Sequence, residues 1–229
     1  MRELTADMFV SLDGFAAGAD GGQSWTFGYF GPEFAAYAQR VLAGPQIMIM
    51  GRVTYEIMVR SWPSAPGPLA GPMNNLPKLV FSATLAEPLA WNNAQLAKHE
   101  PVEEIRALKG QPGDPLRTIG SITLVRHLMA AGLVDRLRLI VFPHVLGQAG
   151  QEPVFTGYPE TSLTLASTTV LDSSLVVCEY PRRRQLLMTT PMTAPDLGVT
   201  AQVVTRTTPI HGGSGPRPSC RPGMYRIQR

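Results

Sequence analysis

Two segments of the sequence combine residue types that can bind an anion: Met50-Gly51-Arg52-Val53-Thr54 and Ile119-Gly120-Ser121-Ile122-Thr123. In each segment a glycine follows a short apolar run and precedes the start of a helical pattern. The first backbone N–H groups of a helix lack intrahelical acceptors, and the helix dipole favours negative charge there. Either segment alone is more often a tight turn, and no G-x-G-x-x-G pattern is present. Together they predict a site for the phosphates of a dinucleotide.

Three other side chains are candidates for contact with a substrate. Asp13 ends the first predicted strand, where it either orients a substrate and supplies a proton or is simply the first residue of an Asp-Gly turn. Trp25, in the following loop, either forms a wall of the same pocket or covers the core. His144 follows Pro143 in a loop, and we expect a structural role for it; His127 is expected to be solvated.

The elements that must position these residues alternate between strand and helix. Apolar patterns predict strands at residues 4–10, 47–50, 78–81, 116–119 and 136–142, and a hairpin of residues 162–171 and 173–180 that turns at Asp172-Ser173. Helical spacing is found at 32–43, 52–60 and 102–109, and in a helix with Ser121 as its candidate N-cap that closes at Gly132. Residues 61–77, rich in Pro and Gly, are expected to be irregular. This order predicts a three-layer α/β fold with a mixed central sheet flanked by helices.

Composition predicts one folded domain, residues 1–181, and a tail, residues 182–229. The chain has 229 residues, of which 44% are hydrophobic. The first 180 residues hold 12 Lys and Arg against 16 Asp and Glu, whereas the last 49 hold eight Arg against one Asp. We therefore expect no nucleic-acid partner for the domain, and a basic, Pro- and Gly-rich, disordered tail.

Other features of the sequence bear on compartment and metal binding. No apolar segment has the length of a signal or a membrane span, which predicts a cytoplasmic protein. The two cysteines, Cys178 and Cys220, are far apart in the sequence and form no CxxC pair. We expect neither a disulfide scaffold nor a metal site.

The run Ile49-Met50-Gly51-Arg52-Val53-Thr54-Tyr55-Glu56 resembles the strand-to-helix signature of the dihydrofolate reductase family. Four further landmarks occur in the order found in the related reductase domain of riboflavin biosynthesis (RibD C-terminal-like) and its stand-alone relatives. They are Ser11-Leu12-Asp13-Gly14, Leu79-Val80-Phe81-Ser82, Gly120-Ser121, and Gly132-Leu133-Val134-Asp135 with Val145-Leu146-Gly147. The resemblance spans residues 4 to about 180 and implies a dihydrofolate-reductase-like fold.

The resemblance also implies a reductase that binds NADPH. It places Gly51, Arg52 and Thr54 at the phosphates on the adenosine side, with Arg52 at the 2′-phosphate, because a guanidinium matches phosphate geometry. Ser82 corresponds to a serine that contacts the cofactor, although Ala83 stands where a second hydroxyl is common. The pyrophosphate is expected at Gly120, Ser121, Ile122 and Thr123.

The implied substrate is a small molecule, pterin-like or a ribosylaminopyrimidine, as for 5-amino-6-(5-phosphoribosylamino)uracil reductase. Phe34 stands where the folate enzymes carry a carboxylate, and the adjacent Glu33 is turned by about 100° on a helix. This departure argues against a true dihydrofolate reductase and leaves a non-catalytic nucleotide-binding module as an alternative. The H-x-E and P-C-x-x-C motifs of the deaminase partner are absent. Relatives of this type lead us to expect a homodimer in contact through residues 136–180.

Overall fold

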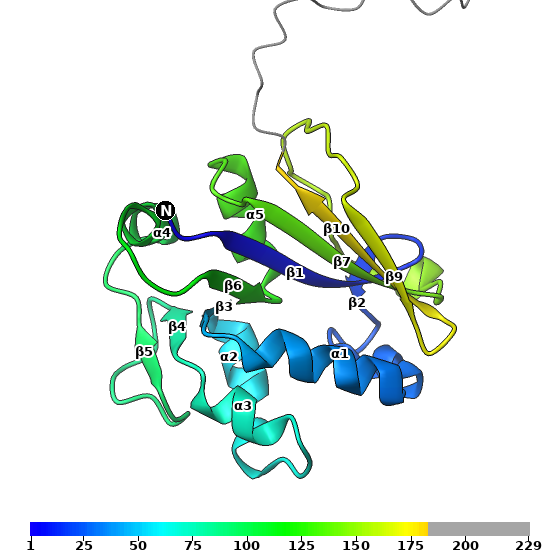
Figure 1. Ribbon diagram of the computed structural model, residues 1–229, viewed down its shortest axis with the longest axis horizontal. Coiled ribbons are helices and arrows are strands. Elements are labelled where there is room, and N and C mark those ends of the chain that lie inside the picture. Colours follow the sequence, from blue (N-terminus) through cyan, green and yellow to red (C-terminus); the bar gives the residue numbers. More distant parts are fainter. Residues whose placement is uncertain (183–229) are drawn as a thin grey trace, which may run out of the picture. The chain divides into compact units, whose positions relative to one another are not determined.

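The computed structural model describes residues 1–182, and its centre is an eight-stranded sheet in the order β5-β4-β3-β6-β1-β7-β10-β9 (Figure 1). The strands are β1 Leu4–Ser11, β3 Ile47–Gly51, β4 Lys78–Phe81, β5 Ala94–Leu96, β6 Leu116–Ile119, β7 Arg136–Phe142, β9 Ser167–Leu171 and β10 Leu175–Pro181. A separate antiparallel pair consists of β2 Phe15–Ala17 and β8 Gln151–Pro153.

The sheet is mixed, as predicted. Strands β5, β4, β3, β6, β1 and β7 are all parallel to one another. Strand β10 is antiparallel to β7, and β9 is antiparallel to β10. The carboxyl ends of the six parallel strands therefore lie along one edge, where open α/β sheets bind their ligands.

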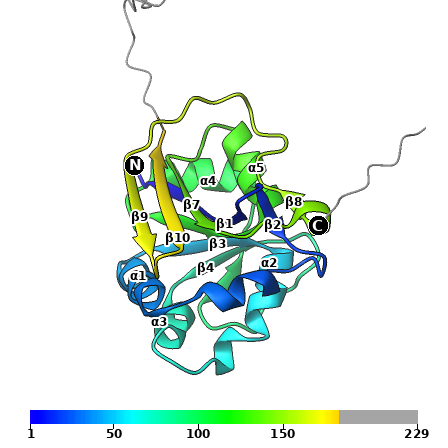
Figure 2. The same ribbon diagram turned by 90° about the vertical axis from the view of Figure 1, so that its right-hand side faces the viewer.

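Helices cover both faces of the sheet (Figure 2). Helices α4 Pro101–Gly110 and α5 Ile122–Ala130 lie on one face, and α1 Pro32–Ala43, α2 Arg52–Val59 and α3 Ala70–Asn75 lie on the other. Alternation along β1 produces this division. Its even-numbered residues, such as Leu4 and Met8, pack with Ile105 and Leu128 of α4 and α5, whereas Phe9 belongs to the cluster on the α1 face.

The α1 face also contains buried charge that the sequence analysis did not anticipate. Asp7 of β1 is only 6% exposed and pairs with Arg117 of β6 and Arg138 of β7. Glu179 of β10 extends the row through its own pair with Arg138. Oppositely charged partners on adjacent strands make the burial of these groups tolerable.

Residues 61–77, expected to be irregular, contain a 3₁₀ turn Trp62–Ser64 and helix α3. This prediction was wrong because Leu69, Met73 and Leu76 find apolar partners in the cluster around Trp91, and their packing outweighs the local effect of Pro and Gly. The predicted tail lies outside the described residues, except for Arg182. Within the described part of the chain, no helix has both the length and the apolar character needed to cross a membrane.

Candidate functional site at the carboxyl edge of the sheet

The fold brings the two predicted anion-binding junctions into direct contact. The hydroxyl of Ser121, at the start of α5, accepts a hydrogen bond from the backbone N–H of Gly51 at 2.7 Å. The same hydroxyl lies 2.7 Å from Oγ1 of Thr54, in the first turn of α2. Ser121 is the N-cap residue by position, as predicted, but its side chain makes no capping bond to its own helix. It links the two junctions instead.

Both helices begin without a side-chain cap, because the N-cap residue of α2 is Gly51 and the hydroxyl of Ser121 is used in the bridge. Gly120 and Ser121 both have left-handed backbones, with φ of +69° and +64°. That conformation suits glycine and is unfavourable for serine, and such positions tend to cluster at ligand sites. Ile122 and Thr123 follow in the first turn of α5, where their backbone N–H groups have no intrahelical acceptor. The arrangement presents uncapped helix N-termini side by side, which suits a pyrophosphate.

Arg52 lies at the first position of α2, beside this pair of N-termini. Its Nη1 contacts both carboxylate oxygens of Glu56 at 2.9 Å, one helical turn further on. The two side chains are 45% and 35% exposed, so the pair is accessible to solvent and to ligands. An exposed i,i+4 ion pair is weak. The guanidinium is thus free to exchange Glu56 for a phosphate at little cost.

Ser82 follows β4 and shapes the loop there. Its Oγ accepts hydrogen bonds from the backbone N–H groups of Thr84 and Leu85, at 3.1 and 3.0 Å. The hydroxyl therefore organises a turn at the edge where the adenosine side is expected, and it also lies 3.5 Å from the hydroxyl of Thr84.

Asp13 is held as a turn residue. Its carboxylate accepts hydrogen bonds from the Ser11 hydroxyl at 2.7 Å and from the backbone N–H groups of Leu146 and Gly147 at 3.1 and 2.7 Å. The Ser11 hydroxyl, followed by these backbone donors, lowers the pKa of Asp13 to about 2. A carboxyl group with this pKa has no proton to give at neutral pH. Of the two roles considered for Asp13, the contacts favour the turn residue, which also joins the ends of β1 and β7.

Trp25 lies in the 3₁₀ turn Ser24–Tyr29 (η1), against the carboxyl ends of β1 and β7. Its indole packs edge-on against Phe142, at 5.3 Å between ring centroids, and beside His144 at 5.6 Å. Tyr29 contacts the same two residues. Trp25 thus covers part of the core and also bounds the edge where the substrate is expected.

Phe34, which replaces the acid of the folate enzymes, joins an aromatic cluster on the sheet. It stacks on Phe30 at 4.6 Å and meets Phe9 edge-on at 6.1 Å. Glu33, as expected, is directed elsewhere: its carboxylate accepts a hydrogen bond from the backbone N–H of Asp172. No carboxylate therefore stands at the Phe34 position.

The start of α1 is capped by a residue that the local sequence does not indicate. The Asp172 carboxylate, from the turn between β9 and β10, accepts hydrogen bonds from the backbone N–H groups of Gly31, Glu33 and Phe34, at 3.2, 3.0 and 2.9 Å. A residue 140 positions away thus caps the helix that carries Phe34. The Asp-Ser turn itself was predicted; its contact partner could not be read from local sequence.

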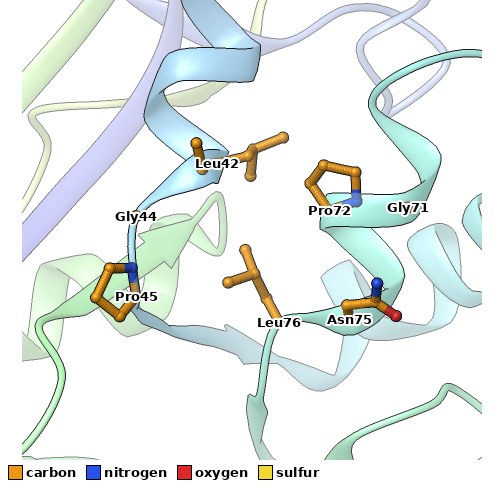
Figure 3. Close-up of a pocket in the computed structure, with 8 residues that line it drawn as sticks. Leu42, Gly44, Pro45, Gly71, Pro72, Asn75 and Leu76 are labelled. Atoms are coloured by element: carbon orange, nitrogen blue, oxygen red, sulfur yellow. The ribbon is translucent and has the colours of Figure 1, made fainter.

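Two surface hollows lie away from this edge. One of about 550 Å³ is formed where α1 ends and α3 passes, and Leu42, Pro45, Pro72 and Leu76 line it (Figure 3). The other, of about 480 Å³, is at the amino ends of β3 to β5 and includes Lys78. The first has no charged lining residue, and the Lys78 ammonium already donates to three backbone carbonyls. Neither offers a free cationic side chain for phosphates, so we place the candidate site at the junctions.

Comparisons with known proteins agree with this fold. One relative is an uncharacterized protein, YyaP, from Bacillus subtilis (strain 168), 26% identical over 185 residues, which are 78% of this chain and 94% of that protein. A crystal structure of a putative riboflavin biosynthesis protein from Shewanella sp. PV-4 superposes with a TM-score of 0.64 at 23% identity, covering 80% of this chain and 99% of that one.

A dihydrofolate reductase from Enterococcus faecalis, complexed with NADP(H) and RAB-propyl, superposes with a TM-score of 0.54 at 15% identity, covering 79% of this chain and 96% of that one. The fold is therefore dihydrofolate-reductase-like. The family model of the RibD C-terminal domain matches residues 2–177. The chain belongs to the RibD C-terminal domain family.

Proposed function

We propose that this protein is an NADPH-dependent reductase of a pterin-like or ribosylaminopyrimidine substrate. The observation that carries the proposal is the Ser121 bridge, which sets two uncapped helix N-termini side by side with Arg52 adjacent. The family and the NADP(H) complex of a protein with the same fold support the choice of cofactor. The name of the Shewanella structure supports a substrate of the riboflavin type.

The residues present fit a dinucleotide phosphate group. Gly120 and Ser121, with positive φ, lead into the uncapped start of α5, and the guanidinium of Arg52 adds the one cation at the start of α2. In this arrangement Gly120 to Thr123 would hold the pyrophosphate, and Gly51, Arg52, Thr54 and Ser82 would hold the adenosine side. When bound, the reduced nicotinamide supplies a hydride, and the protein supplies its orientation.

The order of the strands predicts the direction in which the cofactor lies along the carboxyl edge of the sheet. Arg52 and Ser82 follow β3 and β4, whereas the pyrophosphate junction follows β6. An extended dinucleotide that continues in this direction reaches the ends of β1 and β7, where Trp25 and the aromatic cluster lie. From β4 to β7 there are four strand spacings, or roughly 19 Å. We place the substrate at that end.

The experiment measures binding and turnover separately. Calorimetric titration with NADPH and NADH tests the cofactor, and the loss of absorbance of the reduced nicotinamide is followed with a panel of dihydrofolate, pterins and the ribosylaminopyrimidine. We expect NADPH to bind and the ribosylaminopyrimidine or a pterin to be reduced. A protein that binds neither NADPH nor NADH would refute the proposal.

A second candidate function is a nucleotide-binding module without turnover. Phe34 in place of the acid, together with an Asp13 that carries no proton at neutral pH, favours it. Tight binding of NADPH with no oxidation by any member of the panel would select this alternative. The cytoplasmic location and the homodimer stay predictions, and light scattering at micromolar concentration checks the latter.

A further inference from the structure

Reduction of a C=N or C=O group needs a proton as well as a hydride, and the substrate end of the site offers few sources. Asp13 is fully ionised at neutral pH. Glu33 and Asp172 are occupied with each other's backbone N–H groups at the start of α1. Among the described residues at this end, His144 is the remaining side chain of a type that exchanges protons near neutral pH.

His144 is fixed at the carboxyl edge by its backbone. Two residues beyond β7, its carbonyl accepts a hydrogen bond from Leu12 N–H at 2.8 Å, and its own N–H donates to the Phe142 carbonyl at 2.8 Å. The ring is half-buried beside the indole of Trp25. Position and orientation are therefore set by β1, β7 and η1 together.

Tyr29 determines which ring nitrogen is free. Its hydroxyl lies 3.1 Å from Nδ1 of His144 and 3.4 Å from the carbonyl oxygen of Pro143. The single hydroxyl proton can satisfy the Pro143 carbonyl, which leaves the phenol oxygen to accept a hydrogen bond from Nδ1–H. Nε2 makes no hydrogen bond to any residue of the described chain. It is the nitrogen available to a ligand.

The indole of Trp25, which lies beside the His144 ring, has an unpaired donor. Its Nε1 is buried and has no acceptor among residues 1–182. Buried N–H groups without an acceptor are rare in proteins, and each one needs an explanation such as a bound molecule. The indole and imidazole rings are 5.6 Å apart between centroids, so an acceptor atom of a substrate beside His144 could satisfy Nε1 once the groups that now cover it move.

We propose that His144, held by Tyr29, is the proton donor of the reaction; this role rests on the proposed function. The substrate carbon receives the hydride from the reduced nicotinamide, which becomes oxidised, and the π electrons of the C=N or C=O bond move to the heteroatom. That atom takes the proton from Nε2 of the imidazolium. The neutral ring keeps its Nδ1–H on Tyr29, and water restores the Nε2 proton. Tyr29 is a positioning residue.

The charged and titratable groups that face His144 are few. Tyr29 contacts the ring from η1, and the Asp13 carboxylate binds the backbone of Leu146 and Gly147 in the same loop. The test therefore uses His144→Gln, which cannot become cationic, and Tyr29→Phe, which loses only the hydroxyl. His127→Gln, a substitution of an exposed histidine on α5, is the matched control.

We expect all four proteins to bind NADPH equally in a fluorescence titration. With the substrate identified in the panel, wild type and His127→Gln should lose rate as pH rises. His144→Gln should be slower by a factor of about 10²–10⁴ and should lack that dependence. Tyr29→Phe should keep the pH dependence but react at a lower rate.

A spectroscopic measurement tests the arrangement without turnover. In ¹⁵N NMR of the imidazole, neutral His144 should carry its proton on Nδ1 in wild type and shift toward the Nε2 form in Tyr29→Phe. A His144→Gln enzyme with the wild-type rate and pH profile would overturn the assignment while leaving the reductase intact. A wild type that binds NADPH but reduces nothing would overturn the proposed function, and the proton-donor role with it.

Discussion

The two halves of the carboxyl edge are built in different ways. The cofactor half consists of two junctions, β3 to α2 and β6 to α5, each encoded by five consecutive residues and joined by one side chain, Ser121. The substrate half is assembled from distant segments: the Asp13 turn, η1, the start of α1 and the loop after β7. Local sequence therefore specifies each junction of the first half, although not the contact between them, and long-range packing specifies the second half.

Because of this difference, the two halves can tolerate different sequence changes in evolution. A dinucleotide phosphate is constant, and backbone N–H groups at helix starts recognise it through local motifs. Substrates vary, and a site made of loops and aromatic side chains can vary with them without disturbing the sheet. The predictions below test whether the halves are as independent as their construction indicates.

Among the tests of this comparison, the largest expected effect is on cofactor choice. Arg52→Ala should weaken NADPH binding about 10- to 150-fold and leave NADH binding nearly unchanged, because a charge-assisted contact is worth roughly 1.5–3 kcal/mol. Titration of both cofactors into both proteins measures it. As a matched variant, Glu56→Gln removes the competitor for the guanidinium, and NADPH should bind about twofold more tightly. If Arg52→Ala keeps the full preference for NADPH, the assignment of Arg52 is wrong.

In the substrate half, Asp172→Ala should lower the free energy of unfolding by about 2 kcal/mol, since the N-cap residue and two residues of the first turn of α1 lose the acceptor of their N–H groups. The melting temperature should fall by about 4–8 °C. Asp172 also has a φ of +51°, which asparagine tolerates. Asp172→Asn keeps one acceptor oxygen and should lose about half as much. Equal melting of wild type and Asp172→Ala would show that the cap is unimportant.

Within the cofactor half, Ser121→Ala removes the bridge and should cost about 1 kcal/mol. The loss of the bridge should appear specifically as faster hydrogen exchange at the Gly51 amide, because that amide loses its acceptor. Thr123→Ala, two residues away with an exposed hydroxyl that makes no hydrogen bond in the described structure, should leave that amide unchanged. Unchanged exchange at Gly51 in Ser121→Ala would mean that the junctions are held together by packing alone.

The same contrast explains which features of the structure could be predicted from the sequence. Helix 32–43 and strands 78–81, 116–119 and 136–142 were predicted with the bounds that the structure shows, because their apolar period is locally complete. The missed features depend on partners remote in sequence. Helix α3 needs the Trp91 cluster, Asp172 needs the start of α1, and the buried Asp7 needs Arg117 and Arg138 from neighbouring strands. No local pattern contains that information.

The smallest expected effect is the pH dependence that Asp13 contributes to stability. Its pKa is about 2 in the folded protein against an ordinary value of 3.8, so the folded state binds its proton less readily than the unfolded state does. The resulting stabilisation is fully present above pH 3.8 and is lost as pH falls toward 2. Asp13→Asn should therefore be less stable than wild type near neutral pH, and the two should converge in acid.

Thermal melts of both proteins between neutral pH and about pH 2 measure this convergence. Ser11→Ala removes the hydroxyl that lowers the pKa of Asp13 most. Its melting temperature at neutral pH should therefore lie between those of wild type and Asp13→Asn. Divergence of the curves on acidification would contradict the assignment. The outcome also separates the two roles of Asp13: a turn residue changes melting, whereas a proton donor would change the rate of reduction with the melting curve intact. Because its carboxylate is already satisfied by three donors, we expect the change in melting.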